Sequence, residues 1–143
     1  MRISTKGRYS LEALLYLALL PQDEYTSVRD IAQYTGISDG YLEQLFIPLK
    51  KAGIIHSSRG PNGGYLPGRE LTQISVGDVL RAVEGPLEPV ACLESENCPN
   101  ETWCLSRHTW GELYKTIADY VNTLSLADLT EIYRTIDGPE YII

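Results

Sequence analysis

Apolar residues recur along this chain at the spacing of amphipathic helices. Near the amino terminus they fall at i, i+3, i+4 and i+7, which predicts a helix with one apolar face formed by Leu11, Leu14, Leu15 and Ala18. A serine followed three residues later by an aspartate, which is a helix-capping pattern, occurs at Ser27, Ser75 and Ser125. Apolar residues at helical spacing follow each serine, so a helix is expected after each. A longer helix is predicted over residues 105–124, with one side formed by Trp110, Leu113, Ile117, Tyr120, Val121 and Leu124.

The segment YTGIS, residues 34–38, predicts the end of one helix, a tight glycine turn and a new helix capped by Ser38. Two helices joined in this way form a helix-turn-helix, whose second helix presents its first side chains to the major groove of DNA. Its apolar stripe is Leu42, Leu45, Phe46 and Leu49, which leaves other side chains available near the helix start, namely Asp39, Gly40, Tyr41, Glu43 and Gln44. Pro48 removes one backbone hydrogen bond, so a kink or early loosening is expected there.

A β-hairpin is predicted directly after this helix. Ile54 and Ile55 begin one strand, residues 60–64 form a glycine-rich turn, and Tyr65 begins the return strand. No Gly-Lys-Ser/Thr sequence follows the glycines, which argues against a phosphate loop. A hairpin after a recognition helix is the wing of a winged helix, and Arg59 at its start is positioned for the DNA minor groove. The alternative is a solvated turn arginine, but the preceding helix-turn-helix favours groove contact.

The charge of the chain is unevenly distributed. The 143 residues suit one domain, or a small domain with an arm, and carry a net charge of −7. Residues 1–70 contain eight Lys or Arg against seven Asp or Glu, whereas the rest contains four against twelve. This asymmetry suits a half that faces nucleic acid joined to one that avoids phosphate, although ordinary drift in surface charge is an equal alternative. No membrane span or signal peptide is recognisable, so a cytoplasmic protein with reduced thiols is expected.

All three cysteines, Cys92, Cys98 and Cys104, lie in one acidic segment, CLESENCPNETWC. An odd number of cysteines cannot form a complete disulfide framework. Thiolates are the usual ligands of iron–sulfur clusters, which generally take four protein ligands. Zinc sites favour closely paired Cys-x-x-Cys ligands, and a catalytic cysteine would need a base that the sequence does not supply, so no enzyme is expected. From the residues alone, metal ligands and three free thiols remain equal alternatives.

Several segments together resemble the Rrf family of winged-helix transcription regulators, in order and over nearly the whole chain. They are MRISTKGRYSLEALLYLA, SDGYLEQLF, SSRGPNGGYLPG, SVGDVLRAVEG and the cysteine segment. The resemblance is closest to the iron–sulfur cluster regulators, with cysteine-metabolism repressors as near neighbours. It implies a homodimer, held largely by the long helix, that binds a two-fold symmetric operator in double-stranded DNA. The expected fold is mainly α, with a winged helix-turn-helix in residues 1–84, a cysteine-bearing sensor loop in 85–104, and the dimerisation and C-terminal helices in 105–143.

The resemblance also implies which residues contact DNA: Arg2, Ser38, Gly40, Tyr41, Glu43, Gln44, Arg59 and Gly60. A serine commonly stands in the family where this chain has Gly40, so one contact differs and the operator sequence cannot be transferred. The carboxylate of Glu43 repels phosphate and accepts hydrogen bonds only from donors such as the cytosine amino group. In the resembled regulators this glutamate helps to separate two classes of DNA site.

The resemblance further implies an iron–sulfur cluster on the three cysteines, with a 2Fe-2S cluster favoured. In the resembled regulators the fourth ligand is a histidine three residues after the third cysteine, but here that position is Arg107 and the histidine is His108. Both positions share the helical face of Cys104, and an arginine stays protonated, so His108 is the first candidate. The alternative for His108 is packing beside Trp110. Some relatives use the first helix of the other subunit, which here indicates Glu12 of the partner subunit.

We therefore expect a regulator, mainly a repressor, that senses iron–sulfur cluster status and controls cluster-assembly or cysteine-supply genes. One alternative is a cluster-free repressor of cysteine metabolism, governed by a partner enzyme of cysteine synthesis or by thiol oxidation. A nitric-oxide-sensing repressor that uses the same cysteines is another. A metal-binding or redox enzyme is the rival outside the regulators, but no base, substrate-pocket motif or phosphate loop supports it.

Overall fold

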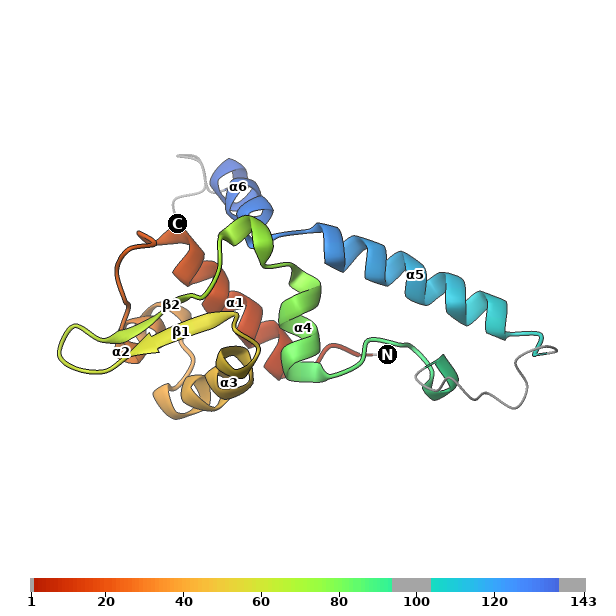
Figure 1. Cartoon of the computed structure of the whole chain (residues 1–143), viewed down its shortest axis with the longest axis horizontal. Helices are drawn as coiled ribbons and strands as arrows, with labels where there is room; N and C mark the ends of the chain where they lie inside the picture. Colours follow the sequence, from red (N-terminus) through yellow and green to blue (C-terminus); the bar gives the residue numbers. More distant parts are fainter. Residues whose placement is uncertain (1, 94–103, 137–143) are drawn as a thin grey trace.

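The computed structural model describes residues 2–93 and 104–136 of the chain. These residues form a compact body from which one long helix projects (Figure 1). In chain order the elements are α1 (Thr5–Leu19), α2 (Val28–Thr35), α3 (Asp39–Lys51), β1 (Ile55–Ser58), β2 (Gly64–Pro67), η1 (Leu71–Gln73), α4 (Val76–Glu84), η2 (Ala91–Leu93), α5 (Arg107–Thr123) and α6 (Leu126–Ile136). The predicted winged helix-turn-helix is therefore present, with α2 and α3 as its two helices and β1–β2 as its wing. In the described part of the chain, no helix is both long and apolar enough to cross a membrane.

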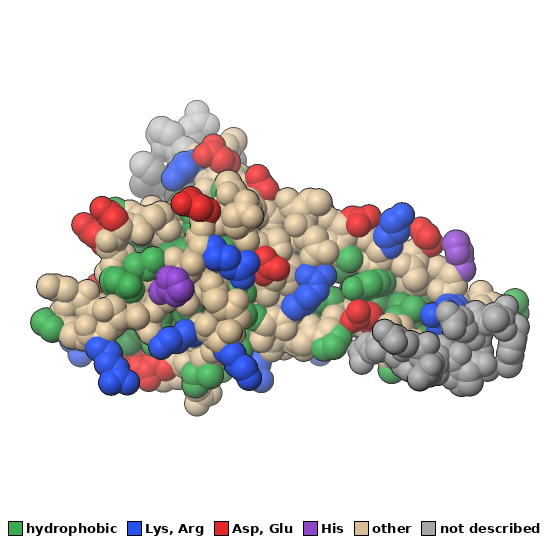
Figure 2. Space-filling view, in the orientation of Figure 1, with side chains coloured by type: hydrophobic (Ala, Val, Ile, Leu, Met, Phe, Trp, Pro, Cys, Tyr) green, Lys and Arg blue, Asp and Glu red, His purple; other side chains and the backbone are tan. Residues whose placement is uncertain are grey.

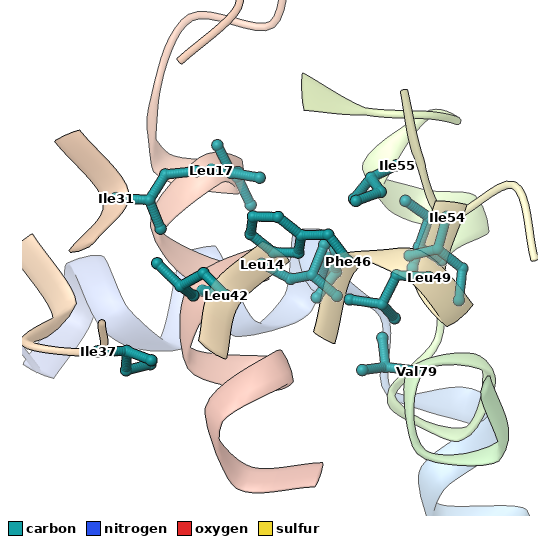
Figure 3. Close-up of a cluster of buried hydrophobic side chains, with 14 residues drawn as sticks. Leu14, Leu17, Ile31, Ile37, Leu42, Phe46, Leu49, Ile54, Ile55 and Val79 are labelled. Carbon is teal, nitrogen blue, oxygen red and sulfur yellow. The ribbon is translucent and has the colours of Figure 1, made fainter. Parts of the chain in front are cut away.

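A shared apolar core holds the first three helices, the hairpin and α4 together. Phe46 of α3 is almost completely buried, among Leu14 and Leu17 of α1 and Leu49 of its own helix (Figure 3). Its ring packs on that of Tyr65 in β2, with the ring centroids 4.5 Å apart. Burial of each large apolar side chain contributes about 1.5–3 kcal/mol, so this core fixes the recognition helix against the wing.

The serine caps predicted from the sequence are confirmed. The side-chain oxygens of Ser27, Ser38 and Ser75 accept hydrogen bonds from the backbone N–H three residues on, at 3.2, 3.3 and 3.0 Å. At Ser75 and Ser125 the aspartate carboxylate also accepts from the serine N–H, which completes two capping boxes. Gly36 ends α2 with a φ of 75°, a left-handed conformation that glycine adopts without strain.

The loosening of α3 expected at Pro48 does not occur. The helix continues through Pro48 to Lys51, and the intervening Leu49 is fully buried. A proline inside a helix removes one backbone bond and crowds the preceding turn. The apolar contacts of Leu49 and Phe46 with the core offset that cost, so tertiary packing overrides the local preference.

The wing is attached to the segment before α2 as well as to α3. The two strands pair antiparallel, with Ser58 opposite Gly64. The backbones of Thr26 and Tyr65 also exchange two hydrogen bonds, at 2.9 and 2.8 Å. Gly64 has a φ of 143°, and a Cβ at this position would lie 2.2 Å from the Thr26 carbonyl oxygen. The close approach of the wing to Thr26 therefore requires glycine at position 64.

The last two helices are placed differently. α6 returns to the body, where Leu126 is fully buried in the core and its N–H donates to the Ile74 carbonyl at 2.9 Å. α5 projects from the body and is held at its carboxyl end, where the Arg81 guanidinium donates to the Asn122 side-chain oxygen at 2.6 Å (Figure 1). One helix of the segment 105–143 thus packs on α1, while the domain boundary at residue 105 stays a prediction.

Replacing Gly64 with alanine is expected to destabilise the protein, because the new methyl group would meet the Thr26 carbonyl and φ would be strained. A loss of about 1–3 kcal/mol is expected, seen as a lower Tm in thermal unfolding. Gly111→Ala in α5 is the control, since nothing lies within 4 Å of its Cβ position, and it should leave Tm unchanged or raise it. Equal Tm values for Gly64→Ala and the wild type would contradict the close approach.

Candidate nucleic-acid interface and metal site

The recognition helix α3 buries one face and exposes the other. Its stripe of apolar residues lies in the core, whereas Glu43 and Gln44, on the first turns, are exposed. Ser38 caps the helix and is itself exposed, so its hydroxyl holds the helix start at the surface. Gly40 is exposed with nothing within 4 Å of its Cβ position, so the absence of a side chain there leaves open space. These four positions form the exposed edge that sequence reasoning assigned to DNA.

Tyr41 is held in place by α1. Its ring meets that of Tyr9 edge to face, with the centroids 6.0 Å apart and the planes at 88°. The Arg8 guanidinium lies 5.8 Å from the centroid of the Tyr9 ring on the same helix. Edge-to-face pairs restrict ring orientation, so contact with Tyr9 limits the rotation of the Tyr41 side chain.

Glu43 is electrostatically linked to the wing. Burial raises the pKa of the Tyr65 phenol, and the negative charge of Glu43 raises it further. The charge of Glu43 therefore acts on the Tyr65 phenol of β2. A carboxylate on the recognition helix disfavours phosphate and leaves hydrogen-bond donors as its partners.

Sequence reasoning missed Ile47. This side chain is 68% exposed and lies four residues after Glu43 and three after Gln44, on the same face of α3. An isoleucine next to a buried apolar stripe is usually assumed to be buried too, so the exposure of Ile47 was not predicted. Its position outside the helical spacing of that stripe is the signal that could have indicated exposure. An exposed aliphatic group on a recognition helix can contact the methyl group of thymine.

The tip of the wing carries Arg59 and Gly60, both exposed. Gly60 has a φ of 103° and accepts a hydrogen bond from the Gly63 N–H at 3.0 Å, which forms the tight turn after the arginine. Figure 2 shows Lys and Arg side chains gathered toward the lower edge of the body, over the region of α3 and the hairpin, and Asp and Glu side chains along the upper edge. Several basic side chains thus lie over the recognition helix and wing, while others lie across the middle of the body and on α5.

Arg2 lies away from this tip. It lines a hollow of about 370 Å³ between the amino-terminal segment, α4 and α5, together with Glu84, Glu88 and Ile117. The structure therefore brings Arg2 to the junction of the two halves of the chain, and its contact with DNA stays a prediction.

The structure describes two of the three cysteines of the candidate metal site. Cys92 and Cys104 are half-buried free thiols, whereas Cys98 lies outside the described residues. Cys104 and His108 line one open hollow of about 410 Å³ at the start of α5, and Leu93, next to Cys92, lines it too. Within residues 2–93 and 104–136, no three Cys, His, Asp or Glu side chains form a complete metal site.

The surroundings of Cys104 lower the pKa of its thiol. The Ser106 hydroxyl lies 3.6 Å from the Cys104 sulfur. Hydrogen bonds from the Ser106 hydroxyl and backbone lower the pKa of the Cys104 thiol, and the backbone N–H and positive charge of Arg107 lower it further. The thiolate is the form that binds metals and reacts with oxidants, so Cys104 fits either role.

The candidate fourth ligands lie in different places. His108 is exposed in the first turn of α5, whereas Cys104 lies three residues before the helix begins, so the two do not share a helical face as expected from the sequence. Arg107 and Glu112 line the same hollow as both of them. Glu112, four residues after His108 on α5, places a carboxylate on the same side of the helix. Glu12 is exposed on α1. Its role toward a second subunit stays a prediction.

The fold and the exposed basic wing are those of a winged helix-turn-helix DNA-binding transcription regulator. The family model of Rrf2, described as an iron-dependent transcriptional regulator, matches residues 3–132. The chain belongs to the Rrf2 family. The resemblance stated from the sequence and the mainly α winged-helix fold are both confirmed.

Similar proteins include two kinds of named regulator. The HTH-type transcriptional regulator IscR of Yersinia pseudotuberculosis is 41% identical over 129 residues, which cover 90% of this chain and 79% of the relative. The solved structure of CymR, the global cysteine regulator of B. subtilis, is 38% identical with a TM-score of 0.77, covering 92% of this chain and 98% of that one. T. potens IscR is 31% identical with a TM-score of 0.78, covering 99% and 97%. These named relatives are transcription regulators.

Replacing Arg59 with alanine is expected to weaken DNA binding, because the exposed guanidinium at the wing tip would no longer neutralise phosphate or enter the groove. We expect the dissociation constant to rise by about tenfold and the slope of its logarithm against the logarithm of salt concentration to fall by about one. Fluorescence anisotropy with a duplex selected by the wild-type protein from random sequences measures both. Arg134→Ala on α6, which removes the same charge elsewhere, is the control. An unchanged salt slope for Arg59→Ala would exclude the contact.

Proposed function

We propose that this chain is a DNA-binding regulator, mainly a repressor, that senses iron–sulfur cluster status through Cys92, Cys98 and Cys104. Its targets would be genes of iron–sulfur cluster assembly or cysteine supply. The observation that carries this proposal is the hollow at the start of α5, which both Cys104 and His108 line. A thiolate and an imidazole are suitable ligands for iron in a 2Fe-2S cluster.

The residues at this hollow fit such a group. The pKa of the Cys104 thiol is lowered, His108 has a solvent-exposed imidazole, and Arg107 adds a positive charge next to them. When bound, an iron–sulfur cluster supplies a redox-active centre that responds to iron, oxygen or nitric oxide. The part of this chain is to hold that centre with thiolates and to offset negative charge with Arg107. Glu12 of the partner subunit is the alternative fourth ligand.

We further propose that the protein acts as a homodimer held by α5. Leu113 and Tyr120 are 41% and 67% exposed, although they lie seven residues apart on one face of this projecting helix. Val121, by contrast, is buried against α4, so α5 uses one side for its own body and leaves another uncovered. A dimer would cover Leu113 and Tyr120 and present two recognition helices to a two-fold symmetric operator.

Regulation of cysteine metabolism without a cluster is the second candidate. It is supported by the similarity to B. subtilis CymR, which is 38% identical to this chain with a TM-score of 0.77. In this case the Cys104 thiol, whose pKa is lowered by its neighbours, would be the reactive group, open to oxidation, and a cysteine-synthesis enzyme would be a further partner. The two candidates share the DNA-binding half and differ in whether the thiols hold iron.

Purification without oxygen is expected to yield a coloured protein that contains iron and sulfide. Cys92→Ala, Cys98→Ala and Cys104→Ala should each abolish the visible absorption, because each removes one ligand. Iron and sulfide assays after reconstitution provide the measurement. A wild-type protein that stays colourless and free of iron and sulfide would exclude the cluster and leave the cysteine-metabolism candidate.

His108→Ala is expected to change the visible and electron paramagnetic resonance spectra of the reconstituted protein and to shorten the lifetime of its chromophore. The other histidine of the chain, His56 in β1 of the wing, provides the control, because His56→Ala leaves the hollow intact. Identical spectra for wild type and His108→Ala would exclude His108 as ligand and direct the same measurement to Glu12→Gln.

Leu113→Glu is expected to convert the dimer to monomer, because a charge would be buried on the exposed apolar face of α5. Sedimentation equilibrium should show the dimer dissociation constant rise by at least about tenfold, equivalent to about 1.4 kcal/mol. Lys115→Glu, two residues along and on the opposite side of the helix, should leave the dimer intact. A wild-type protein that is monomeric at high concentration would contradict the proposed interface.

A further inference from the structure

We propose that Glu84 is a positioning residue for DNA binding, which fixes the first turn of α1 so that Lys6 stands beside the recognition helix and contacts the DNA backbone. The proposal needs only the DNA-binding role of α3, and it is independent of whether the cysteines hold a cluster. It joins two residues that sequence reasoning did not assign to any role, and they come from opposite ends of the DNA-binding half.

One carboxylate oxygen of Glu84 occupies the start of α1. It accepts hydrogen bonds from the backbone N–H of Ser4 and of Gly7, both at 3.0 Å, and from the Ser4 hydroxyl. The Ser4 side-chain oxygen also accepts from the Lys6 N–H at 3.2 Å. The first N–H groups of a helix have no partner within it, so a carboxylate here both satisfies them and suits the positive helix end. The first turn of α1 is thus held by a residue of α4.

Helices α1 and α4 are in close contact at Gly7. A Cβ at Gly7 would lie 2.7 Å from the Glu84 carboxylate oxygen, 2.9 Å from the Ile3 side chain and 3.2 Å from that of Leu80. Gly7 itself is buried. Because α4 can approach α1 this closely only at a glycine, the position of Glu84 relative to the first turn is sharply defined.

Lys6, on the turn that Glu84 holds, lies next to the DNA-reading face of α3. It lines a hollow of about 260 Å³ together with Tyr41 and Gln44, two of the residues assigned to DNA. The rest of the lining is apolar, namely Leu45, Pro48, Ala82 and Val83, so Lys6 is the one charged residue among these seven. Lys6 is also exposed. A lysine ammonium next to a recognition helix is a typical contact for a DNA phosphate.

Because Glu84 is negatively charged, a role in positioning Lys6 can be distinguished from a direct electrostatic effect on DNA. A carboxylate near DNA repels phosphate, so its removal by itself would tighten DNA binding. If Glu84 acts by positioning Lys6, then Glu84→Ala must weaken DNA binding despite the loss of a negative charge. Glu84→Gln keeps an oxygen that accepts hydrogen bonds and should therefore retain most of the affinity.

The test compares Lys6→Ala, Glu84→Ala, Glu84→Gln and the double variant Lys6→Ala/Glu84→Ala in the full-length, reduced protein. The probe is a duplex selected by the wild-type protein from random sequences, and the dissociation constant is measured between 50 and 200 mM salt, a range over which phosphate contacts alter affinity by roughly a factor of ten or more. Lys6→Ala and Glu84→Ala should each weaken binding several-fold and lower the salt slope by about one. The double variant should bind about as well as either single variant, because both changes remove the same contact. Glu131→Ala on α6 removes an equal charge from an exposed site and is the control.

Tighter binding by Glu84→Ala, additive losses in the double variant, or an unchanged salt slope in Lys6→Ala would each overturn the proposal. Thermal unfolding is measured for every variant, since Glu84 also stabilises α1. If Glu84→Ala does not fold, Lys6→Ala decides on the phosphate contact, and Glu84→Asp, which withdraws the carboxylate by one methylene, replaces Glu84→Ala in the cycle. A lower Tm with unchanged affinity and salt slope would make Glu84 a purely structural cap and would also refute the inference.

Discussion

Packing of five other elements against α1 is the constraint on which the rest of the structure depends. Helices α2, α3, α4 and α6 and strand β2 all pack against it. Five neighbours fit around one helix only if some of its residues are small, and its buried positions include Gly7, Ser10, Ala13 and Ala18. The large side chains of Leu14 and Leu17 then fill the space toward α3. The recognition helix, the wing and the helix leading to the cysteines therefore share one support, and their relative positions are set by it.

The sequence predicted best what depends on neighbours along the chain. Serine caps, apolar stripes and the glycine turn of the wing specify their elements within a few residues, and these predictions are confirmed. The prediction that α3 loosens at Pro48 was wrong, because burial of Leu49 outweighs the local destabilisation of the helix by proline. The carboxylate of Glu84 at Ser4 could not be predicted, since the two residues are 80 positions apart and only packing brings them together. Ile47 was missed for a related reason: periodicity identifies the buried side of a helix, not the role of its exposed side. The cysteine ligand set could be predicted only through the family resemblance, and Cys98 lies outside the described residues.

The two halves of the chain differ in charge and in how they are held. The half that reads DNA is nearly neutral, packed on a common core and basic near α3 and the wing, whereas the second half carries twelve of the nineteen acidic residues. Negative charge on the second half disfavours docking of DNA on the wrong face. The junction between them is narrow. Glu84 ends α4, Gly85 follows with a φ of 85°, and the chain then leaves toward Cys92. Any rearrangement of the cysteine segment would therefore act on the body through a short connection next to α1 and through the carboxyl end of α5.

The attachment of α5 at one end gives it the mechanics of a lever. Its carboxyl end is fixed to the body through Asn122 and Val121, while Cys104 and His108 lie at the far end. A helix of 17 residues is about 25 Å long at 1.5 Å per residue, so a tilt of about 10° about the fixed end would move the far end by roughly 4 Å. Conversely, a displacement of a few ångströms among the cysteines would correspond to a rotation of only a few degrees at the carboxyl end of the helix. Such a rotation is small within one subunit, but in a two-fold symmetric pair the same rotation would occur in the second α5 as well.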